Sequence, residues 1–181
     1  MRRLAALLAL ALVLGGGFLV LQAAKPPWWE RLWYPLPYAQ IVRGHARNYQ
    51  LDPALLAAVI YAESKFHSDA RSRSGAIGLM QLLPETAKGI AAHTGGTRFE
   101  VSDLTNPELN VRYGAWYLRH LIDKYGDERT ALAAYNAGQD NVDRWRAENR
   151  GIAFPETRHY VRRVEHLKEL YHRGYHGELY G

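Results

Sequence analysis

The stretch LDPALLAAVIYAESKF, residues 51–66, contains both a helix start and an unusual carboxylate. Asp52 is a favourable N-cap and Pro53 suits the first helical position, so a helix is expected to begin at this pair. Counting back from Glu63 in helical steps reaches three aliphatic residues, Ile60, Val59 and Leu56. A helix stripe of this kind normally faces the core, where burial disfavours an ionised carboxylate and raises its pKa.

A carboxylic acid that stays protonated near neutral pH is what a general acid needs to protonate a leaving group. The alternative is that the helix ends close to Glu63 and that this side chain points into solvent, because helix ends are difficult to place from sequence. The stretch alone leaves both interpretations open.

From Tyr38 onward the sequence predicts an all-α domain, because no run alternates as a half-buried strand would. The 181 residues, 48% of them hydrophobic, are enough for one domain with a core. Besides the helix that carries Glu63, helices are expected at residues 39–49, in a short piece ending at 81, and at 84–94, 107–125, 128–136, 140–148 and 155–172. Their short connections predict a compact domain over residues 38–172, followed by a frayed tail at 173–181.

The first 24 residues predict an export signal or a membrane anchor. Arg2 and Arg3 precede an uncharged run from Leu4 to Leu21, which is longer than a usual cleavable core and approaches the length of a membrane-spanning helix. A cleaved signal remains the alternative. A Pro- and Trp-rich linker is expected at residues 25–37, and its aromatic rings suit either a membrane–water interface or packing on the domain's first helix.

The composition excludes several classes of site. The chain has a formal charge of +5 and a pI near 9.5, but its basic residues are scattered and form no nucleic-acid-binding signature. The absence of cysteine excludes disulfides and thiolate-bound zinc. His172 and His176 have the spacing of a metal pair, but no third ligand accompanies them, so neither a metal nor a cofactor is expected.

Two further motifs are candidates for a ligand cleft. In the loop that follows residue 66, Gly75 and Gly78 allow a close backbone approach or a positive φ, and Gln81 offers a donor and an acceptor. In the stretch AAYNAG, Tyr135 and Asn136 precede Gly138, a residue typical of a helix end. Taken separately, each motif is equally typical of an ordinary turn or packed helix end.

Taken in order, the motifs ES, GLMQ and AYNAG resemble those of the soluble-lytic type of lytic transglycosylase, a branch of the lysozyme superfamily. The likeness extends over about residues 38–170 and includes the text between the motifs, such as SGAIGLMQLLPETA, NPELNVRYGAWYLRHL and ETRHYVRRV. The resemblance implies a lysozyme-like helical domain with a glycan-binding cleft.

The resemblance also implies roles for individual residues. Glu63 corresponds to the single catalytic acid and base. The residues that correspond to the glycan cleft are Ser72, Gln81, Tyr135, Asn136 and Tyr160. Glu156 matches a residue that positions the catalytic group or the substrate, and Leu83 stands where many members carry methionine, which keeps an apolar wall.

The implied activity is cleavage of the β-1,4 bond between N-acetylmuramic acid and N-acetylglucosamine in peptidoglycan glycan strands, with formation of a 1,6-anhydro ring. This location of the substrate implies a protein of the bacterial cell envelope, exported and held by its N-terminal segment or released after cleavage. Two alternatives remain: a hydrolase of the same fold, in which water attacks, and a wall-binding module without activity. Arg71, Arg73 and Lys88 could attract an anionic glycan or peptide stem, or form an ordinary solvated face.

Overall fold

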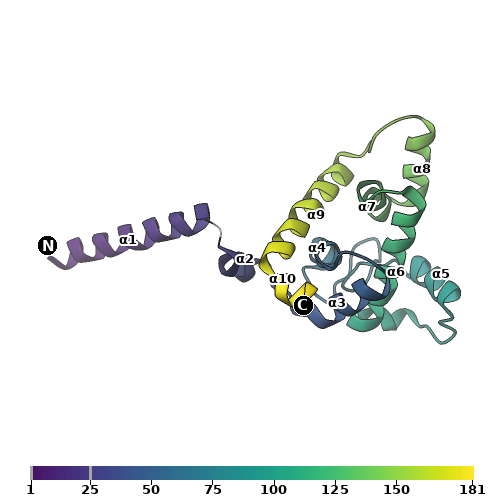
Figure 1. The fold of residues 1–181 in the computed structure, drawn as a ribbon, viewed down its shortest axis with the longest axis horizontal. Helices are drawn as coiled ribbons and strands as arrows, with labels where there is room; N and C mark the ends of the chain where they lie inside the picture. The colour runs from purple at the N-terminus through teal and green to yellow at the C-terminus, as the bar shows by residue number, and fades with distance from the viewer. Residues whose placement is uncertain (1, 25) are drawn as a thin grey trace. The chain divides into compact units, whose positions relative to one another are not determined.

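The computed structural model describes residues 2–24 and 26–181, which divide into two compact units. The first unit ends at Pro35 and the second comprises Leu36–Gly181. No β-strand forms within these described residues; the regular structure there is helical (Figure 1).

The first unit consists of α1 (Arg2–Ala24) and α2 (Pro27–Trp33). The stretch Ala6–Ala24 has 19 residues and a mean hydropathy of 2.2, so it is long and apolar enough to cross a membrane. Helix α2 forms within the expected linker. A proline stands at its first position, where it is compatible with a helix start. Met1 and Lys25, which the sequence places in the signal and in the linker, lie outside the described residues.

Phe18 and the tryptophans of the first unit form one cluster. The ring of Trp29 makes edge contacts with Phe18, Trp28 and Trp33, with centroid separations of 5.7, 5.9 and 6.1 Å. Edge-to-face pairs of this kind are a favoured arrangement of aromatic rings. Trp28 and Trp33 nevertheless remain largely exposed.

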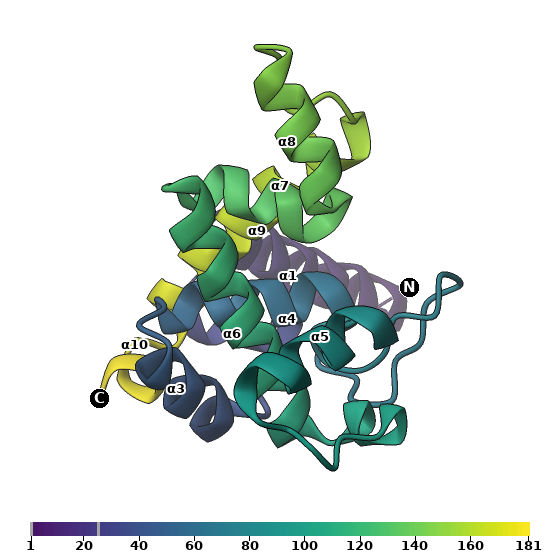
Figure 2. The ribbon, with the colours of Figure 1, turned by 90° about the vertical axis from the view of Figure 1, so that its right-hand side faces the viewer.

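The second unit is built from the helices that follow. They are α3 (Ala39–Asn48), α4 (Pro53–Ser64), α5 (Pro84–Thr94), the 3₁₀ turn η1 (Val101–Thr105), α6 (Pro107–Tyr125), α7 (Glu128–Ala137), α8 (Gln139–Ala147), α9 (Pro155–Gly174) and α10 (His176–Tyr180). Helix α4 packs chiefly along α9. Figure 2 shows α7 and α8 at one end of this unit and α3 and α5 at the other, with α4 between them.

The expected helix starts are confirmed by their caps. The side chain of Asp52 accepts a hydrogen bond from the Ala54 amide at 2.9 Å, and that of Asn106 accepts one from the Leu109 amide at 3.1 Å. Each cap is followed by a proline at the first helical position, as the sequence predicts. Asp127 caps α7 in the same way, through the Thr130 amide at 2.8 Å.

Helix α4 is buried on all sides rather than along one stripe. Every residue from Ala54 to Ile60 is at most 1% exposed. A helix that is apolar all round belongs in the middle of a domain. Glu63 therefore lies at the end of the central core helix of this unit.

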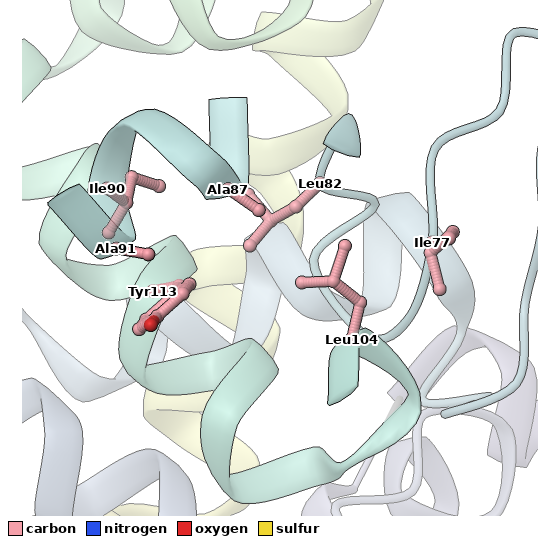
Figure 3. Close-up of a cluster of buried hydrophobic side chains, with 7 residues drawn as sticks. All are labelled: Ile77, Leu82, Ala87, Ile90, Ala91, Leu104 and Tyr113. Atoms are coloured by element: carbon pink, nitrogen blue, oxygen red, sulfur yellow. The ribbon is translucent and has the colours of Figure 1, made fainter. Parts of the chain in front are cut away.

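A second part of the core fixes the loop between α4 and α5. Figure 3 shows the buried cluster formed by Ile77, Leu82, Ala87, Ile90, Ala91, Leu104 and Tyr113. Two of these residues come from the loop, and the others come from α5, η1 and α6. Burial of Ile77 and Leu82 in this cluster anchors the loop on both sides of Gly78 and Gln81.

The structure corrects two expectations. The short helical piece ending at Gln81 does not form; the chain there makes turns and two isolated bridges, Arg71 with Ile77 and Ile77 with Leu82. The frayed tail is also wrong, because residues 176–180 form α10, which packs against α3, α4 and α9. Leu179 is only 2% exposed, and burial of this apolar side chain holds the segment in place.

Candidate functional site

Glu63 occupies the last turn of α4, which ends at Ser64. The next two residues take left-handed backbone conformations, with φ of 51° at Lys65 and 64° at Phe66. Both interpretations of the sequence therefore hold in part: the helix does end beside Glu63, and its side chain is still partly buried. Non-glycine residues in this conformation carry strain and are frequent at functional sites.

The surroundings of Glu63 favour its protonated form. The pKa of Glu63 is raised from 4.5 to about 7. Burial causes the rise, and the Tyr160 hydroxyl and the positive charge of Arg163 offset only part of it. The charge of Glu63 in turn helps to raise the pKa of the hydroxyls of Tyr135 and Tyr160, whose burial is the larger cause. Near neutral pH this carboxyl is able both to give and to take a proton.

The loop between α4 and α5 depends on Asn110, a residue of α6 that is completely buried. Its Oδ1 accepts from the Met80 amide at 2.7 Å, while its Nδ2 donates to the carbonyls of Ile77 at 3.0 Å and Leu104 at 2.8 Å. One side chain thus satisfies three backbone groups, two of them 30 or more residues away in sequence. Buried polar groups require such partners, so Asn110 determines the path of the loop.

Gly78 is required where the loop passes Asn110. Its φ is +84°, and a Cβ atom at this position would overlap the Asn110 side chain and the Leu104 carbonyl. Both reasons for a glycine that the sequence suggested, a positive φ and a close approach, therefore apply at Gly78.

Gln81 is held with its amide oxygen available. Its Nε2 donates to the carbonyls of Ala70 at 3.1 Å and Gly78 at 2.9 Å, and these two acceptors fix which end of the amide is the nitrogen. No partner is found for its Oε1 among the residues that the structure describes. Gln81 thus presents a hydrogen-bond acceptor to the cleft.

Tyr135 and Asn136 lie in the last turn of α7, before Gly138. The Tyr135 hydroxyl donates to the Met80 carbonyl at 2.8 Å, which ties α7 to the loop that carries Gln81. The Oδ1 of Asn136 accepts from the hydroxyl of Thr157 at 2.9 Å. Each of these side chains is therefore held by a specific partner on another element.

These elements enclose two adjoining pockets. The first has a volume of about 390 Å³ and is lined by Glu63, Ser72, Ser74, Ala76, Gln81, Leu82, Leu83, Thr86, Tyr117, Tyr135, Asn136, Ala137 and Gly138. The second, of about 490 Å³, is lined by Ala62, Glu63, Ser64, Lys65, His67, Asp69, Ala70, Arg71, Gln81 and Arg163. Glu63 and Gln81 line both, so these two side chains stand where the pockets meet.

The expected site residues divide into three groups. The first pocket brings Glu63 together with Ser72, Gln81, Leu83, Tyr135 and Asn136. Tyr160 is 8% exposed, and its buried hydroxyl influences Glu63 but has no hydrogen-bond partner of ordinary geometry within residues 2–24 and 26–181. Glu156 is exposed in the first turn of α9 and lines neither pocket.

Three functional candidates were not predicted from the sequence: Asn110, Thr157 and Arg163. Asn110 and Thr157 are buried polar residues that hold the loop and Asn136, respectively. Arg163 follows Tyr160 by one helical turn on α9, and this spacing is the signal that could have placed it on the same face.

The described residues contain no group of three or more histidine or acidic side chains arranged to hold a metal ion. The His172 and His176 rings, which the sequence singled out as a spaced pair, pack against the Tyr180 ring, with centroid separations of 5.1 and 4.9 Å. Their place is in the packing of α10 on α9.

The family model described as Transglycosylase SLT domain matches residues 40–156. The transglycosylase of Enterobacteria phage PRD1 is 35% identical over 123 residues, which cover 68% of this chain and 39% of that protein. The soluble lytic murein transglycosylase of Salmonella typhimurium is 31% identical over 169 residues, with coverage of 76% and 25%. Membrane-bound lytic murein transglycosylase C of Histophilus somni is 35% identical over 126 residues, with coverage of 64% and 35%. The chain thus spans well under half the length of these relatives.

Solved structures give the same result. The lytic transglycosylase Slt of Pseudomonas aeruginosa, solved as an inactive mutant, superposes with a TM-score of 0.73 at 34% identity and covers 79% of this chain and 25% of that one. The 70-kDa soluble lytic transglycosylase of Escherichia coli gives a TM-score of 0.74 at 28% identity, with coverage of 80% and 25%. These likenesses confirm the all-α fold predicted from the sequence.

Proposed function

The chain belongs to the Transglycosylase SLT domain family, and from this premise we propose that it cleaves peptidoglycan glycan strands between N-acetylmuramic acid and N-acetylglucosamine without water. The observation that carries the proposal is Glu63, a carboxyl with a pKa of about 7 at the junction of two pockets. A strand laid through both pockets would pass over this side chain.

In the proposed reaction Glu63 first acts as a general acid. It gives its proton to the glycosidic oxygen while the bond from that oxygen to the anomeric carbon breaks. The acetamido oxygen of the muramic acid stabilises the positive charge that develops on the anomeric carbon.

Glu63 then acts as a base. Its carboxylate takes the proton of the C6 hydroxyl of the same muramic acid, and the freed oxygen bonds to the anomeric carbon and closes the 1,6-anhydro ring. The proton lost in the first step is thereby restored to Glu63, and no water is consumed. A pKa near the working pH suits a group that must act in both directions.

The neighbours of Glu63 suit substrate positioning in this scheme. The free Oε1 of Gln81 would accept a hydrogen bond from a sugar N–H or O–H group. Asn136 and the partly buried ring of Tyr135 lie on the opposite element, α7, where an amide and an aromatic face suit a sugar. Leu83, 44% exposed, would supply an apolar contact at the pocket wall.

Hydrolysis is the alternative within the same fold. An ordinary two-carboxylate glycosidase needs a second carboxyl group at about 5–9.5 Å from the first. Glu156 lines neither pocket, and Asp69 is the other carboxylate that lines either one in the described part of the chain. Asp69 is exposed at the second pocket, so product analysis is needed to separate the two reactions.

We further propose that α1 holds the enzyme at a membrane, with the second unit acting on the cell wall outside it. The apolar stretch Ala6–Ala24 is long enough to span, and the tryptophans of α2 suit a membrane–water interface. A cleaved export signal is the alternative, and the mass of the mature protein from cells distinguishes the two.

The decisive experiment is mass spectrometry of the fragments that the full chain, in detergent, releases from purified cell-wall sacculi. Muropeptides with 1,6-anhydro ends are expected from the native protein, and none from Glu63→Gln. Reducing ends would instead identify a hydrolase. Binding to sacculi with no release of fragments would identify a binding module.

A further inference from the structure

The two pockets that meet at Glu63 differ in charge. Apart from Glu63 itself, the first pocket is lined by neutral side chains, with hydroxyl, amide and apolar groups. Besides Glu63, the second pocket is lined by Lys65, Arg71 and Arg163, together with His67 and one further acid, Asp69. Neutral sugars suit the first pocket, whereas the second attracts negative charge.

The three cations of the second pocket have no ion-pair partner among residues 2–24 and 26–181. Several other basic side chains of this unit are paired, among them Lys88 with Glu85 at 2.7 Å, Arg119 with Asp123 at 2.6 Å and Lys124 with Asp143 at 2.7 Å. Cations that lack a carboxylate partner remain available for an anionic ligand.

Three separate elements bring these cations to one pocket. Lys65 directly follows α4 in a left-handed conformation, and Arg71 lies in the loop, bridged to Ile77. Arg163 comes from α9 and is partly buried, and its charge reaches Glu63, whose pKa it lowers. A helix end, a loop and a second helix thus bring cations to one pocket that includes Glu63. This arrangement distinguishes the three cations from an ordinary solvated face.

We propose that the second pocket, lined by Lys65, Arg71 and Arg163, binds carboxylate groups of the peptide carried by the glycan strand. The inference rests on the proposed function, because it takes peptidoglycan as the substrate. Sugars of the strand are N-acetylated and neutral, so negative charge beside the scissile bond comes from the peptide attached to muramic acid. The charge difference between the pockets would therefore recognise a strand that still bears its peptides.

Lys88 and Arg73 lie outside this site. Both were candidates for attracting an anionic glycan or peptide, but Lys88 pairs with Glu85, and neither residue lines the second pocket. Arg73 is exposed two residues beyond Arg71, so it provides a matched control with the same change of charge.

The test measures binding rather than cleavage. The full chain carrying Glu63→Gln is titrated with a soluble glycan fragment whose peptide carboxylates are free, and with the same fragment after those carboxylates are converted to amides. The fragment with free carboxylates is expected to bind about tenfold more tightly, because several partly exposed charge pairs act together. Adding Lys65→Gln, Arg71→Gln and Arg163→Gln is expected to remove this preference.

The single variants Lys65→Gln and Arg71→Gln, both at exposed positions, keep the test informative if the combined variant does not fold. Each is expected to lower the preference in part, and Arg73→Gln to leave it unchanged. Equal affinity for the two fragments in the parent protein, or variants that weaken both fragments equally, would overturn the proposal. Failure of the proposed function would look different: no 1,6-anhydro product from the protein with Glu63 intact.

Discussion

Glu63 ends a continuous core helix, whereas Gln81, which lines the same two pockets, lies in a loop without regular structure. The position of Glu63 follows from local rules: an Asp52 cap, a proline and an apolar run that is buried all round. The position of Gln81 follows from side chains of α6 and α7, namely Asn110 and Tyr135. One wall of the cleft is thus encoded locally and the other by tertiary contacts.

The largest effect is expected where one side chain supports the loop wall. Asn110→Leu keeps the volume but leaves the Met80 amide and the Ile77 and Leu104 carbonyls without this partner. Each unsatisfied buried group costs about 1–3 kcal/mol, so the free energy of unfolding is expected to fall by about 3–5 kcal/mol. Urea unfolding measures this loss.

A matched control for Asn110→Leu is Asn141→Leu. The Asn141 side chain makes only local bonds: its Nδ2 donates to the Ala137 carbonyl at 2.7 Å, and its Oδ1 accepts from the exposed guanidinium of Arg144 at 2.8 Å. A loss of about 1 kcal/mol is expected there. Equal losses in the two variants would show that Asn110 does not hold the loop.

The next effect separates two glycines of the same loop. Gly75 and Gly78 both have φ of +84°, but a Cβ at Gly75 meets nothing within 4 Å, whereas one at Gly78 overlaps Asn110 and Leu104. Gly75→Ala is expected to cost about 1 kcal/mol, from the left-handed backbone alone. Gly78→Ala is expected to cost about 3 kcal/mol and to lower activity, because overpacking adds to that strain.

Thermal unfolding of the two alanine variants, side by side, makes the comparison. The shared φ cancels, so the difference between them reports the contact with Asn110. Similar midpoints would mean that the loop moves away at little cost, and that its path is less firmly set than the hydrogen bonds of Asn110 indicate.

The division into local and tertiary encoding explains what could be predicted from the sequence. The starts of α4 and α6 followed from caps and prolines adjacent in the chain. The short helix expected before Gln81 was wrong, because Asn110, 30 residues away from Met80, takes the Met80 amide and Gly78 turns the backbone to positive φ. No local pattern contains that information.

The same reasoning applies to the site. Motif order brought Glu63, Gln81, Tyr135 and Asn136 together, whereas Asn110 lies in the middle of an amphipathic helix and resembles any other polar residue there. Helix α10 was missed because it is short and contains a glycine, and its stability comes from packing on α3, α4 and α9. Contacts between distant segments decide both cases.

A third prediction concerns Glu63, on the wall of the cleft that is encoded locally. The pKa of Glu63 rises from 4.5 to about 7 in the folded protein, so the native state binds more protons than the unfolded state between these values. Stability therefore falls as pH rises through this window, by about 3 kcal/mol at most and by about 1–2 kcal/mol after allowance for solvent in the cleft. Glu63→Gln is expected to be more stable than the native protein by that amount at pH 8, and to lack the slope.

Urea unfolding at several pH values between about 4 and 8 compares the two proteins over the window in which Glu63 ionises. Glu148→Gln, at an exposed position at the end of α8, makes the same chemical change away from the cleft and serves as the control. A native protein whose stability relative to Glu63→Gln does not change with pH would contradict the burial of an ionisable Glu63.

The smallest expected effect concerns Arg163 of α9 and its influence on Glu63. The positive charge of Arg163 lowers the pKa of Glu63, so Arg163→Gln is expected to raise it. Since the proposed reaction requires the protonated acid, the alkaline limb of kcat/KM against pH should move to higher pH. Peptidoglycan fragments whose peptide carboxylates are converted to amides are the substrate of choice, because they carry no free carboxylate that could contact the second pocket.

Arg162→Gln provides the comparison, because it removes the same charge from the adjacent, exposed position of α9 and lines neither pocket. The alkaline limb of Arg162→Gln should remain where it is in the native protein. The displacement produced by Arg163→Gln should shrink only slightly in high salt, since a charge beside a partly buried carboxyl is screened less than one on the surface. A limb that moves equally in both variants would show that net charge, and not the position of Arg163 beside Glu63, sets the acidity of the cleft.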